Sequence, residues 1–364
     1  MVTPVLSAGQ APGATALSVN MDAGPRVEGA VVTDNAGSGS AGRNRVGALM
    51  SVNSPLGLGD RFQLVAYGAP DFLQFDHDSD GGYTVIGRAS YDLPVGSRGA
   101  RAGVAVSRVN YTLGGPYRDL SDGYATVYSV YSSYALAHTP SLNLNINANL
   151  DYKRMSDSLF DRPNRRCAQA LTVQLAGDKQ SRLFGLPNVL QYSIGTTLGS
   201  VRHGDDWKGA KTRGKYIKAT QSAKLTQGLR KGIYLALSVD AQQTSRNLDG
   251  SEKMVLGGPN AVRAYGNDAV SADSGYVASA NLNVAVPKIA GITAQLFYDR
   301  AQASVQKFAR RRRDVTLAGY GVGVNYAIGK RAALNLSYAM RAGSDPSLDD
   351  QHKATIWAST VVRF

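Results

Sequence analysis

One arginine of this chain is placed where its charge needs a specific partner. Arg263 belongs to a connection of about 31 residues, 244–274, within the run 255–266 that reads VLGGPNAVRAYG. A connection of this length with its own apolar residues is usually functional. We therefore predict that 244–274 folds back onto the rest of the molecule, where the Arg263 guanidinium would need a carboxylate. The apolar members of the run are Val255, Leu256, Val262 and Tyr265, and the glycines that allow tight reversals are Gly257, Gly258 and Gly266.

Other residue types that could do chemistry are scattered. A Ser or Asp nucleophile needs a positioned His and a third group, and only isolated candidates are present, so the chain is not predicted to be an enzyme. The histidines have no metal-ligand spacing, so neither a metal nor another cofactor is expected. The run 37–42, GSGSAG, matches G-x-G-x-x-G, but the alternating residues after it provide no helix amino terminus for a phosphate. The histidines are His77, His138, His203 and His352, and the single Cys167 is interpreted as a bystander.

The elements that must position Arg263 are strands. From 142 to 152 every even position is apolar or aromatic and every odd position is Asn or Asp. Eleven residues at about 3.3 Å each, tilted by about 45°, cross the hydrocarbon layer of a bilayer about once. The segments 281–286 and 334–341 repeat the pattern, and no run approaches eighteen apolar residues. The chain is therefore predicted to be all-β and to cross a membrane as a closed barrel, which pairs every backbone group.

Turn residues divide the chain into an even number of strands. Short connections alternate with long ones, as in outer-membrane barrels. We predict a sixteen-stranded antiparallel transmembrane barrel over 25–364, closed by pairing 25–35 with 353–364, with the even positions of 142–152 facing lipid. The predicted strands are 25–35, 43–54, 60–69, 82–93, 99–111, 122–136, 142–154, 166–178, 187–200, 213–226, 230–243, 275–286, 291–304, 315–328, 331–342 and 353–364.

Composition and charge agree with a single barrel domain. The chain has 40 Gly and 19 Tyr with a mean hydropathy of -0.21, because half of each barrel strand faces water. The net charge of +13 could indicate a nucleic-acid partner, but Lys and Arg are scattered without a basic helix or a stacking motif. We interpret the charge as contact with anionic lipid and lipopolysaccharide and as a cationic lumen. The densest run, 310–313, is predicted to lie in an outside loop.

The two ends of the chain carry different signals. Residues 1–16 lack the basic and apolar regions of a secretion signal, so we expect a mature fragment with an added start Met. At the other end, Phe364 with Val362 two residues before it resembles the carboxy-terminal assembly signal of bacterial outer-membrane proteins. That resemblance implies the barrel assembly machinery as a partner during biogenesis.

Two short segments resemble the paired motifs of the Omp85 superfamily. Val262, Arg263, Ala264 and Tyr265 resemble its Val-Arg-Gly-Tyr/Phe loop motif, and 297–301, FYDRA, resembles its Phe-x-Asp-x-Gly strand motif with Phe297 and Asp299. The amino-terminal runs 32–37, VTDNAG, and 52–60, VNSPLGLGD, resemble the start of the barrel in the TpsB branch, the two-partner secretion transporters. The resemblance covers 25–364. It implies that the sixth outer loop, 244–274, enters the lumen and that Arg263 pairs with Asp299.

The chain departs from the family pattern at three points. Ala264 and Ala301 stand where the two motifs have Gly, which puts the tight backbone packing there in doubt. TpsB transporters also carry a plug helix and two POTRA domains before the barrel, whereas about 24 residues precede the first predicted strand. We therefore expect 1–24 to be a linker from an upstream region whose POTRA domains are absent.

The resemblance implies a function in the Gram-negative outer membrane. A monomeric TpsB barrel would export a large unfolded β-helical client, a TpsA-type adhesin, haemolysin or contact-inhibition toxin, without ATP, while Arg263 and its loop gate the path. Two alternatives remain open: an assembly-type Omp85 barrel that inserts other outer-membrane proteins, and a passive porin or barrel enzyme. The loop motif separates the transporter and the assembly-type barrel from the passive porin or barrel enzyme. The runs at 32–37 and 52–60 favour the transporter over the assembly-type barrel.

Overall fold

The fold is described from a computed structural model. It covers residues 2–8, 15–21, 24–70, 73–74, 82–115, 118, 120–160, 162–203, 211–287, 289–306, 308, 313–343 and 353–364, with the backbone alone for 2–8, 15–21, Leu159 and His203. His77, His352 and three of the four arginines in 310–313 lie outside the described residues. Among the described residues, no helix is long and apolar enough to cross a membrane.

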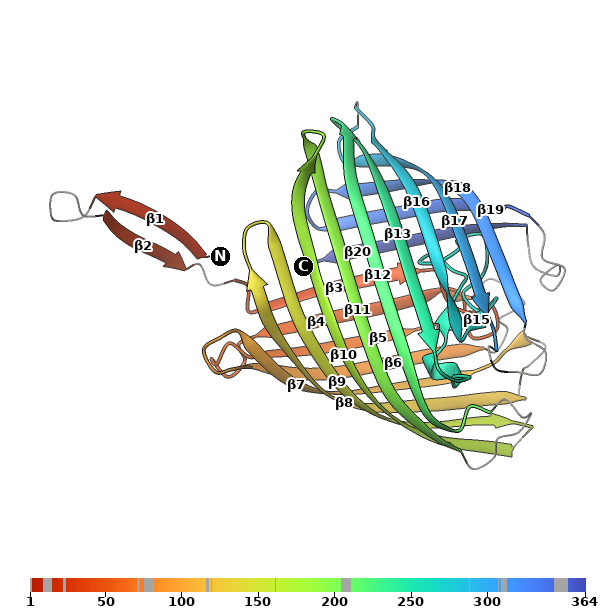
Figure 1. Cartoon of the computed structure of the whole chain (residues 1–364). Coiled ribbons are helices and arrows are strands. Elements are labelled where there is room, and N and C mark those ends of the chain that lie inside the picture. Colours follow the sequence, from red (N-terminus) through yellow and green to blue (C-terminus); the bar gives the residue numbers. More distant parts are fainter. Residues whose placement is uncertain are drawn as a thin grey trace.

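Sixteen strands of the described chain form one closed antiparallel barrel, which confirms the predicted fold class (Figure 1). The last strand pairs with the first barrel strand from Ser359 opposite Asp34 to Arg363 opposite Ala30, as predicted. The barrel strands are β3 Val27–Asp34, β4 Arg45–Asn53, β5 Arg61–Gly68, β6 Tyr83–Val95, β7 Ala100–Thr112, β8 Ser121–His138, β9 Leu142–Leu159, β10 Arg162–Leu183, β11 Leu186–His203, β12 Gly214–Arg230, β13 Ile233–Thr244, β16 Ser274–Ala285, β17 Ile292–Ser304, β18 Asp314–Ile328, β19 Ala332–Arg341 and β20 Ala354–Arg363.

Among the elements that the structure describes, four short strands and one 3₁₀ turn lie outside the barrel wall. The segment predicted as a linker contains β1 Val2–Ala8 and β2 Thr15–Met21, which pair with each other. The connection between β13 and β16 contains the 3₁₀ turn η4 Gly250–Glu252 and the strands β14 Met254–Val255 and β15 Ser271–Ala272. We call residues 245–273 the lumen loop, because their contacts described below are with inward-facing side chains of the barrel.

The register of β9 follows the predicted alternation. Ile146, Leu150 and Tyr152 are exposed on the outer face. Asp151 accepts hydrogen bonds from Ser129 and Asn149, and Lys153 reaches the lumen loop, so the odd positions face inward. Large apolar side chains on the outer face of most strands are similarly exposed, as a lipid-facing surface requires.

Several predicted boundaries were wrong because strands continue past the alternating segment. The β10 strand runs from Arg162 to Leu183 rather than over 166–178, and the β9 strand continues to Leu159. The predicted connection at 228–229 lies within β12, which ends at Arg230 after a register shift. Apolar alternation marks only the part of a strand that faces lipid, whereas backbone pairing continues until a turn ends it. Between β10 and β11 the turn is Phe184 and Gly185, both with positive φ.

The buried apolar core lies between the lumen loop and one side of the barrel wall. Leu256, Val262, Ala264 and Tyr265 of the loop are at most 2% exposed. They pack against inward-facing residues of β16, β17, β18 and β19, among them Val277, Phe297, Ala301, Leu317 and Ala339. The loop therefore supplies apolar contacts that the mostly polar inner wall would otherwise lack. Val255 was expected to be buried and is 48% exposed, because successive residues of the short strand β14 point to opposite sides.

Candidate functional site

The Arg263 guanidinium is bound to Asp299 on β17. Its Nε donates to Asp299 Oδ2 at 2.8 Å and its Nη2 donates to Asp299 Oδ1 at 2.7 Å, so the pair is bidentate. The Arg263 backbone N–H also donates to Oδ2, at 3.1 Å. Asp299 is fully buried and the Arg263 side chain is 10% exposed. The predicted contact between the loop and the strand is therefore present, with both charges removed from water.

Neighbouring strands supply the remaining partners of this pair. Arg263 Nη2 donates to Ser279 Oγ and to Asn281 Oδ1 on β16, and Nη1 donates to Gln295 Oε1 on β17. Ser279 Oγ also donates to Asp299 at 2.6 Å. The guanidinium carbon lies 3.4 Å from the centroid of the Phe297 ring, a cation–π contact. A buried ion pair needs such additional hydrogen bonds to offset its desolvation.

Two backbone carbonyls of the loop motif accept hydrogen bonds from β20. Trp357 Nε1 donates to the Arg263 carbonyl at 2.7 Å, and Thr355 Oγ1 donates to the Ala264 carbonyl at 3.4 Å. The Tyr265 ring lies beneath the Arg341 guanidinium, 4.5 Å from its centroid. The loop motif therefore contacts β16, β17, β19 and β20 together.

The two alanines that depart from the family motifs are both accommodated. Ala264 is fully buried against Gly319 of β18, where an added Cβ would lie 2.5 Å from the Ala264 Cβ. Ala301 is also fully buried and is paired with Val277 and Leu317 in the sheet. Gly319 thus leaves the space that the Ala264 methyl occupies.

The glycines of the lumen loop permit the predicted reversal. Gly258 has a φ of +104°, a conformation that other residues rarely adopt. An added Cβ on Gly257 would lie 2.1 Å from the Gly266 carbonyl oxygen. Gly258 N–H donates to the Tyr265 carbonyl at 2.8 Å, and Tyr265 N–H donates to the Val262 carbonyl at 3.1 Å. These bonds fold 257–266 into a compact turn that presents Arg263.

A second set of ion pairs attaches the lumen loop to other strands. Glu252 accepts from Lys153 Nζ on β9 and from Lys218 Nζ on β12, each at 2.6 Å. Asp249 accepts from Arg166 Nη1 on β10 at 2.5 Å. Burial raises the pKa of the Glu252 carboxyl, but the two ammonium groups outweigh burial, so the pKa lies below its usual value of 4.5.

A third contact joins the lumen loop to the connection after β3. Asp268 Oδ2 accepts from Ser38 Oγ at 2.8 Å and from the Gly39 N–H at 3.0 Å. Asn267 Nδ2 donates to the Ala36 carbonyl. The loop therefore has contacts from β9 around to the connection after β3, and Figure 1 shows it within the outline of the barrel near one end.

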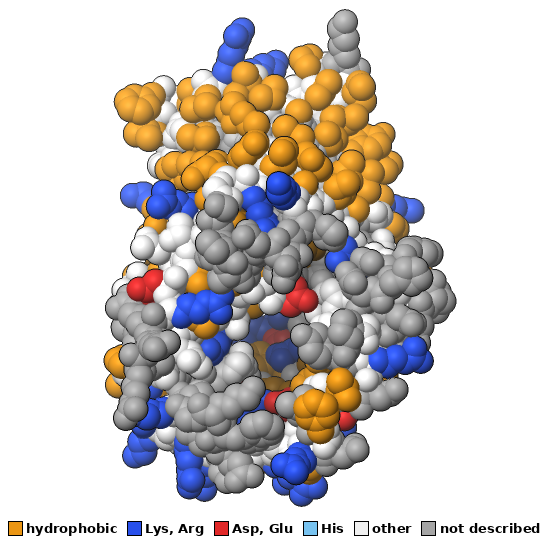
Figure 2. All heavy atoms as spheres, turned by 90° about the vertical axis from the view of Figure 1, so that its right-hand side faces the viewer, with side chains coloured by type: hydrophobic (Ala, Val, Ile, Leu, Met, Phe, Trp, Pro, Cys, Tyr) orange, Lys and Arg blue, Asp and Glu red, His pale blue; other side chains and the backbone are white. Residues whose placement is uncertain are grey.

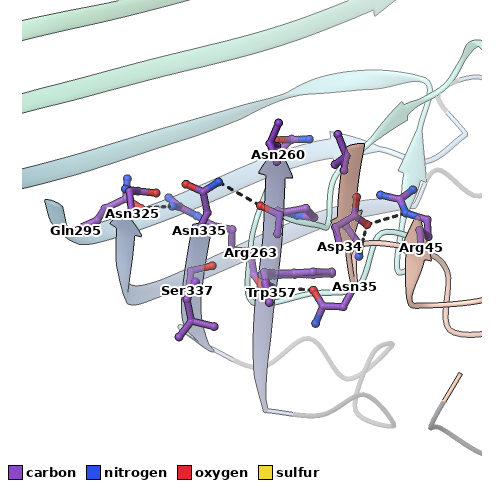
Figure 3. A pocket seen from close by; sticks show the side chains of 17 residues that line it. Asp34, Asn35, Arg45, Asn260, Arg263, Gln295, Asn325, Asn335, Ser337 and Trp357 are labelled. Carbon is purple, nitrogen blue, oxygen red and sulfur yellow. Dashed lines mark hydrogen bonds and ion pairs between the residues drawn. The ribbon is translucent and has the colours of Figure 1, made fainter. Parts of the chain in front are cut away.

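The space that remains beside Arg263 is lined by both polar and apolar side chains. A cavity of about 380 Å³ lies between the tip of the lumen loop and the walls of β17 to β20, β3 and β4. Figure 3 shows Gln295, Asn325 and Asn335 along one side of it and Asp34 with Arg45 along the other. Arg45 Nε donates to Asp34 at 2.8 Å. Figure 2, which faces the loop end of the barrel, shows a hollow with acidic and basic side chains inside it.

The carboxy-terminal residues lie at the closure of the barrel. Val362 is 45% exposed and pairs with Val31 and Ala332. Phe364 exchanges two backbone hydrogen bonds with Gly29, and its ring covers Gly29, where an added Cβ would lie 2.3 Å from the ring. Their role as an assembly signal stays a prediction.

The structure brings the two motifs together but leaves the other candidates apart. His138 is exposed at the end of β8. Within the described residues, no group of three His, Cys, Asp or Glu side chains could hold a metal ion. The sequence interpretation missed Trp357 and the Glu252 and Asp249 ion pairs. A usable signal was present for Lys153, because the odd positions of its strand face inward.

Comparison with known proteins places these features in a family. The family model for the haemolysin secretion/activation protein ShlB/FhaC/HecB matches residues 13–326. The heme/hemopexin transporter protein HuxB of Haemophilus influenzae is 24% identical over 99% of this chain, and the chain spans 64% of that relative's length. CdiB from Escherichia coli superposes with a TM-score of 0.82 at 19% identity, over 100% of this chain and 67% of that one. CdiB from Acinetobacter baumannii superposes with a TM-score of 0.75 at 16% identity, over 100% of this chain and 65% of that one.

Proposed function

Because the chain belongs to the haemolysin secretion/activation family ShlB/FhaC/HecB, we propose that it is the barrel of a two-partner secretion transporter of the TpsB branch. Family membership and the closed sixteen-stranded barrel indicate a protein of the Gram-negative outer membrane. The transported client would be a large secreted protein that enters the barrel unfolded and folds outside. Folding of the client, rather than ATP, would drive export.

The observation that carries this proposal is the lumen loop and its attachment to the barrel wall. A polypeptide can pass only if the loop moves, because the loop contacts strands from β9 around to β3. We infer that the bidentate bond between Arg263 and Asp299 holds the loop in its resting position, and that the loop so held gates and guides the passage of the client. The end of the barrel at which this loop leaves β13 and enters β16 would face the outside of the cell.

The remaining partners follow from the same proposal. The exposed apolar outer face would contact membrane lipid, and basic residues near the strand ends would contact lipopolysaccharide phosphates. The barrel assembly machinery would insert the chain, with Val362 and Phe364 as its signal. Because the barrel closes on itself, no second copy is needed to complete the pore, and we propose a monomer.

The test is a deletion and complementation experiment with the native full-length protein. Loss of the gene should remove one large protein from the culture medium and cell surface while other outer-membrane proteins keep their levels. Complementation with the native gene should restore that protein. Unchanged secretion in the deletion strain would contradict the proposal, and a general loss of outer-membrane proteins would instead indicate an assembly-type barrel.

A further inference from the structure

Three cations on β9, β10 and β12 form a cluster on the inner wall, away from Arg263. Lys153 on β9, Arg166 on β10 and Lys218 on β12 all point inward, and we call them the basic site. Their side chains are 13% to 17% exposed. The basic site binds two carboxylates of the lumen loop, Asp249 and Glu252.

Withdrawal of the loop would leave the basic site with a charge imbalance. Glu252 is the carboxylate that Lys153 and Lys218 share, and Asp249 binds Arg166, whose other carboxylate partner is Asp157 on β9. Removing one side of a buried ion pair leaves the other charge poorly solvated. An incoming carboxylate would therefore be favoured as soon as the loop acids leave.

Two hydrogen-bond donors in and beside the basic site have no acceptor in the docked loop, which points to a ligand with more acceptor atoms. Tyr216 lies two residues before Lys218 on β12, is 4% exposed and packs against Leu248, the neighbour of Asp249. Within the described part of the chain, the Tyr216 hydroxyl and the Arg166 Nε have no hydrogen-bond partner. Buried polar groups are normally hydrogen-bonded. The basic site and Tyr216 can thus donate more hydrogen bonds to a ligand's oxygens than Asp249 and Glu252 accept.

We propose that the basic site is a docking point for an acidic segment of the polypeptide that passes through the barrel, and that Asp249 and Glu252 occupy it at rest. The proposal rests on the proposed function. The resting occupant indicates the ligand's chemistry: two carboxylates three residues apart on one polypeptide. Because the acidic segment and the loop acids compete for the same cations, binding of the segment favours withdrawal of the loop.

The test measures peptide binding to the purified full chain in detergent by fluorescence anisotropy. The probe is a short labelled Gly/Ser peptide that carries Asp-x-x-Glu, and its neutral counterpart carries Asn-x-x-Gln. The Asp249→Asn, Glu252→Gln variant vacates the site and should bind the acidic probe at least about tenfold more tightly than the unaltered chain, because the internal competitor is weakened. Adding Lys153→Gln and Lys218→Gln should abolish that gain. Lys224→Gln, which changes an exposed lysine on the same strand, should leave it intact.

Several outcomes would overturn the proposal. These are equal binding of the neutral probe, an equal loss with Lys224→Gln, or displacement of the acidic probe by inorganic phosphate at the same concentration as by unlabelled peptide. Glu252→Lys serves as a second variant, since like-charge repulsion should expel the loop. Absence of probe binding in both variants also overturns the proposal. Heat-resistant migration controls for folding. The assay needs no secretion, so its failure is distinguishable from failure of the proposed function.

Discussion

Two of the three attachments of the lumen loop to the barrel are ionic, and their charges are reversed. At the first attachment the loop supplies the cation, Arg263, and β17 supplies the carboxylate, Asp299. At the second, the loop supplies Glu252 and Asp249, and the wall supplies lysines and an arginine. The first uses a planar fork with partners on β16 and β17, whereas Glu252 is held by two flexible ammonium groups. We infer from this difference that the first attachment depends on hydrogen-bond geometry and the second mainly on charge.

The largest expected effect comes from removing the first attachment. Arg263→Ala in the full-length protein leaves Asp299 buried without its cation, and breaking a buried pair in this way costs about 3–5 kcal/mol. Secretion of the client should fall at least about tenfold while heat-resistant migration of the barrel is kept. Asp299→Ala should act alike, and the double variant should lose little more than either single variant, since the two residues act as a unit.

Arg300→Ala is the matched control for this prediction, because Arg300 is adjacent to Asp299 but exposed. Secretion assays with quantified surface levels decide the outcome. If Arg263→Ala and Asp299→Ala both secrete normally at unaltered surface levels, the first attachment is structural and does not control the path.

A smaller effect should follow from filling the space beside Ala264. Gly319→Ala would place a Cβ 2.5 Å from the Ala264 Cβ, and overpacking of this kind costs about 1–3 kcal/mol. The loop should become more accessible to protease, and secretion should fall. Ala264→Gly in the same chain should restore both properties in large part, because the closest contact is removed and only the Met340 carbonyl oxygen, 3.1 Å from the added Cβ, stays tight. Gly87→Ala is the control, because a Cβ there would meet nothing within 4 Å. Failure of Ala264→Gly to restore the Gly319→Ala chain would refute this packing.

The smallest effect is expected at the second attachment and depends on pH. Since the pKa of Glu252 is lowered in the docked loop, its ionised form stabilises docking above about pH 4.5, and this contribution is lost as the pH falls through the lowered pKa. Conductance in planar bilayers should therefore increase below pH 4.5. Glu252→Gln should raise conductance modestly at neutral pH and reduce the pH response, since the Asp249 bond to Arg166 remains.

Glu28→Gln, which changes an exposed glutamate on β3, is the control for the pH experiment. A pH response of the same size in Glu252→Gln and in the unaltered chain would show that another group controls the effect. Together with the Arg263 variants, this experiment compares how much each of the two attachments contributes to holding the loop in its docked position.

The number and orientation of the barrel strands could be predicted because one face of the wall contacts lipid and the other contacts water. Apolar and polar residues therefore alternate along a strand with a period of two. The alternation at 142–152 identified the lipid-facing residues of β9 without any knowledge of its neighbours. The lengths of β9, β10 and β12 could not be predicted in the same way. Their extensions carry no lipid-facing pattern, and only pairing with the adjacent strand determines where they end.

Part of the candidate site could be predicted from short sequence motifs. Arg263 and Asp299 were named from the resemblance of two local segments, and their contact is present in the structure. Trp357 and Lys218 gave no local signal, since they lie 94 and 34 residues from their partners. For Lys153, 99 residues from Glu252, the alternation indicated an inward direction but not the partner. Nothing near Glu252 in the sequence indicates which strands it will reach.

The sequence by itself determined the sixteen strands, the inward or outward direction of the side chains of 142–152 and, through resemblance to a family, the two paired motifs, because each of these is encoded within a few consecutive residues. The tertiary structure alone decided which inward residues meet the lumen loop. Closure of the barrel brings β20 beside β3, and the path of the loop then brings Glu252 between Lys153 and Lys218 and leaves Val255 exposed while Leu256 is buried. These contacts depend on the path of the loop in three dimensions, and the alternation of residues along a strand does not determine that path.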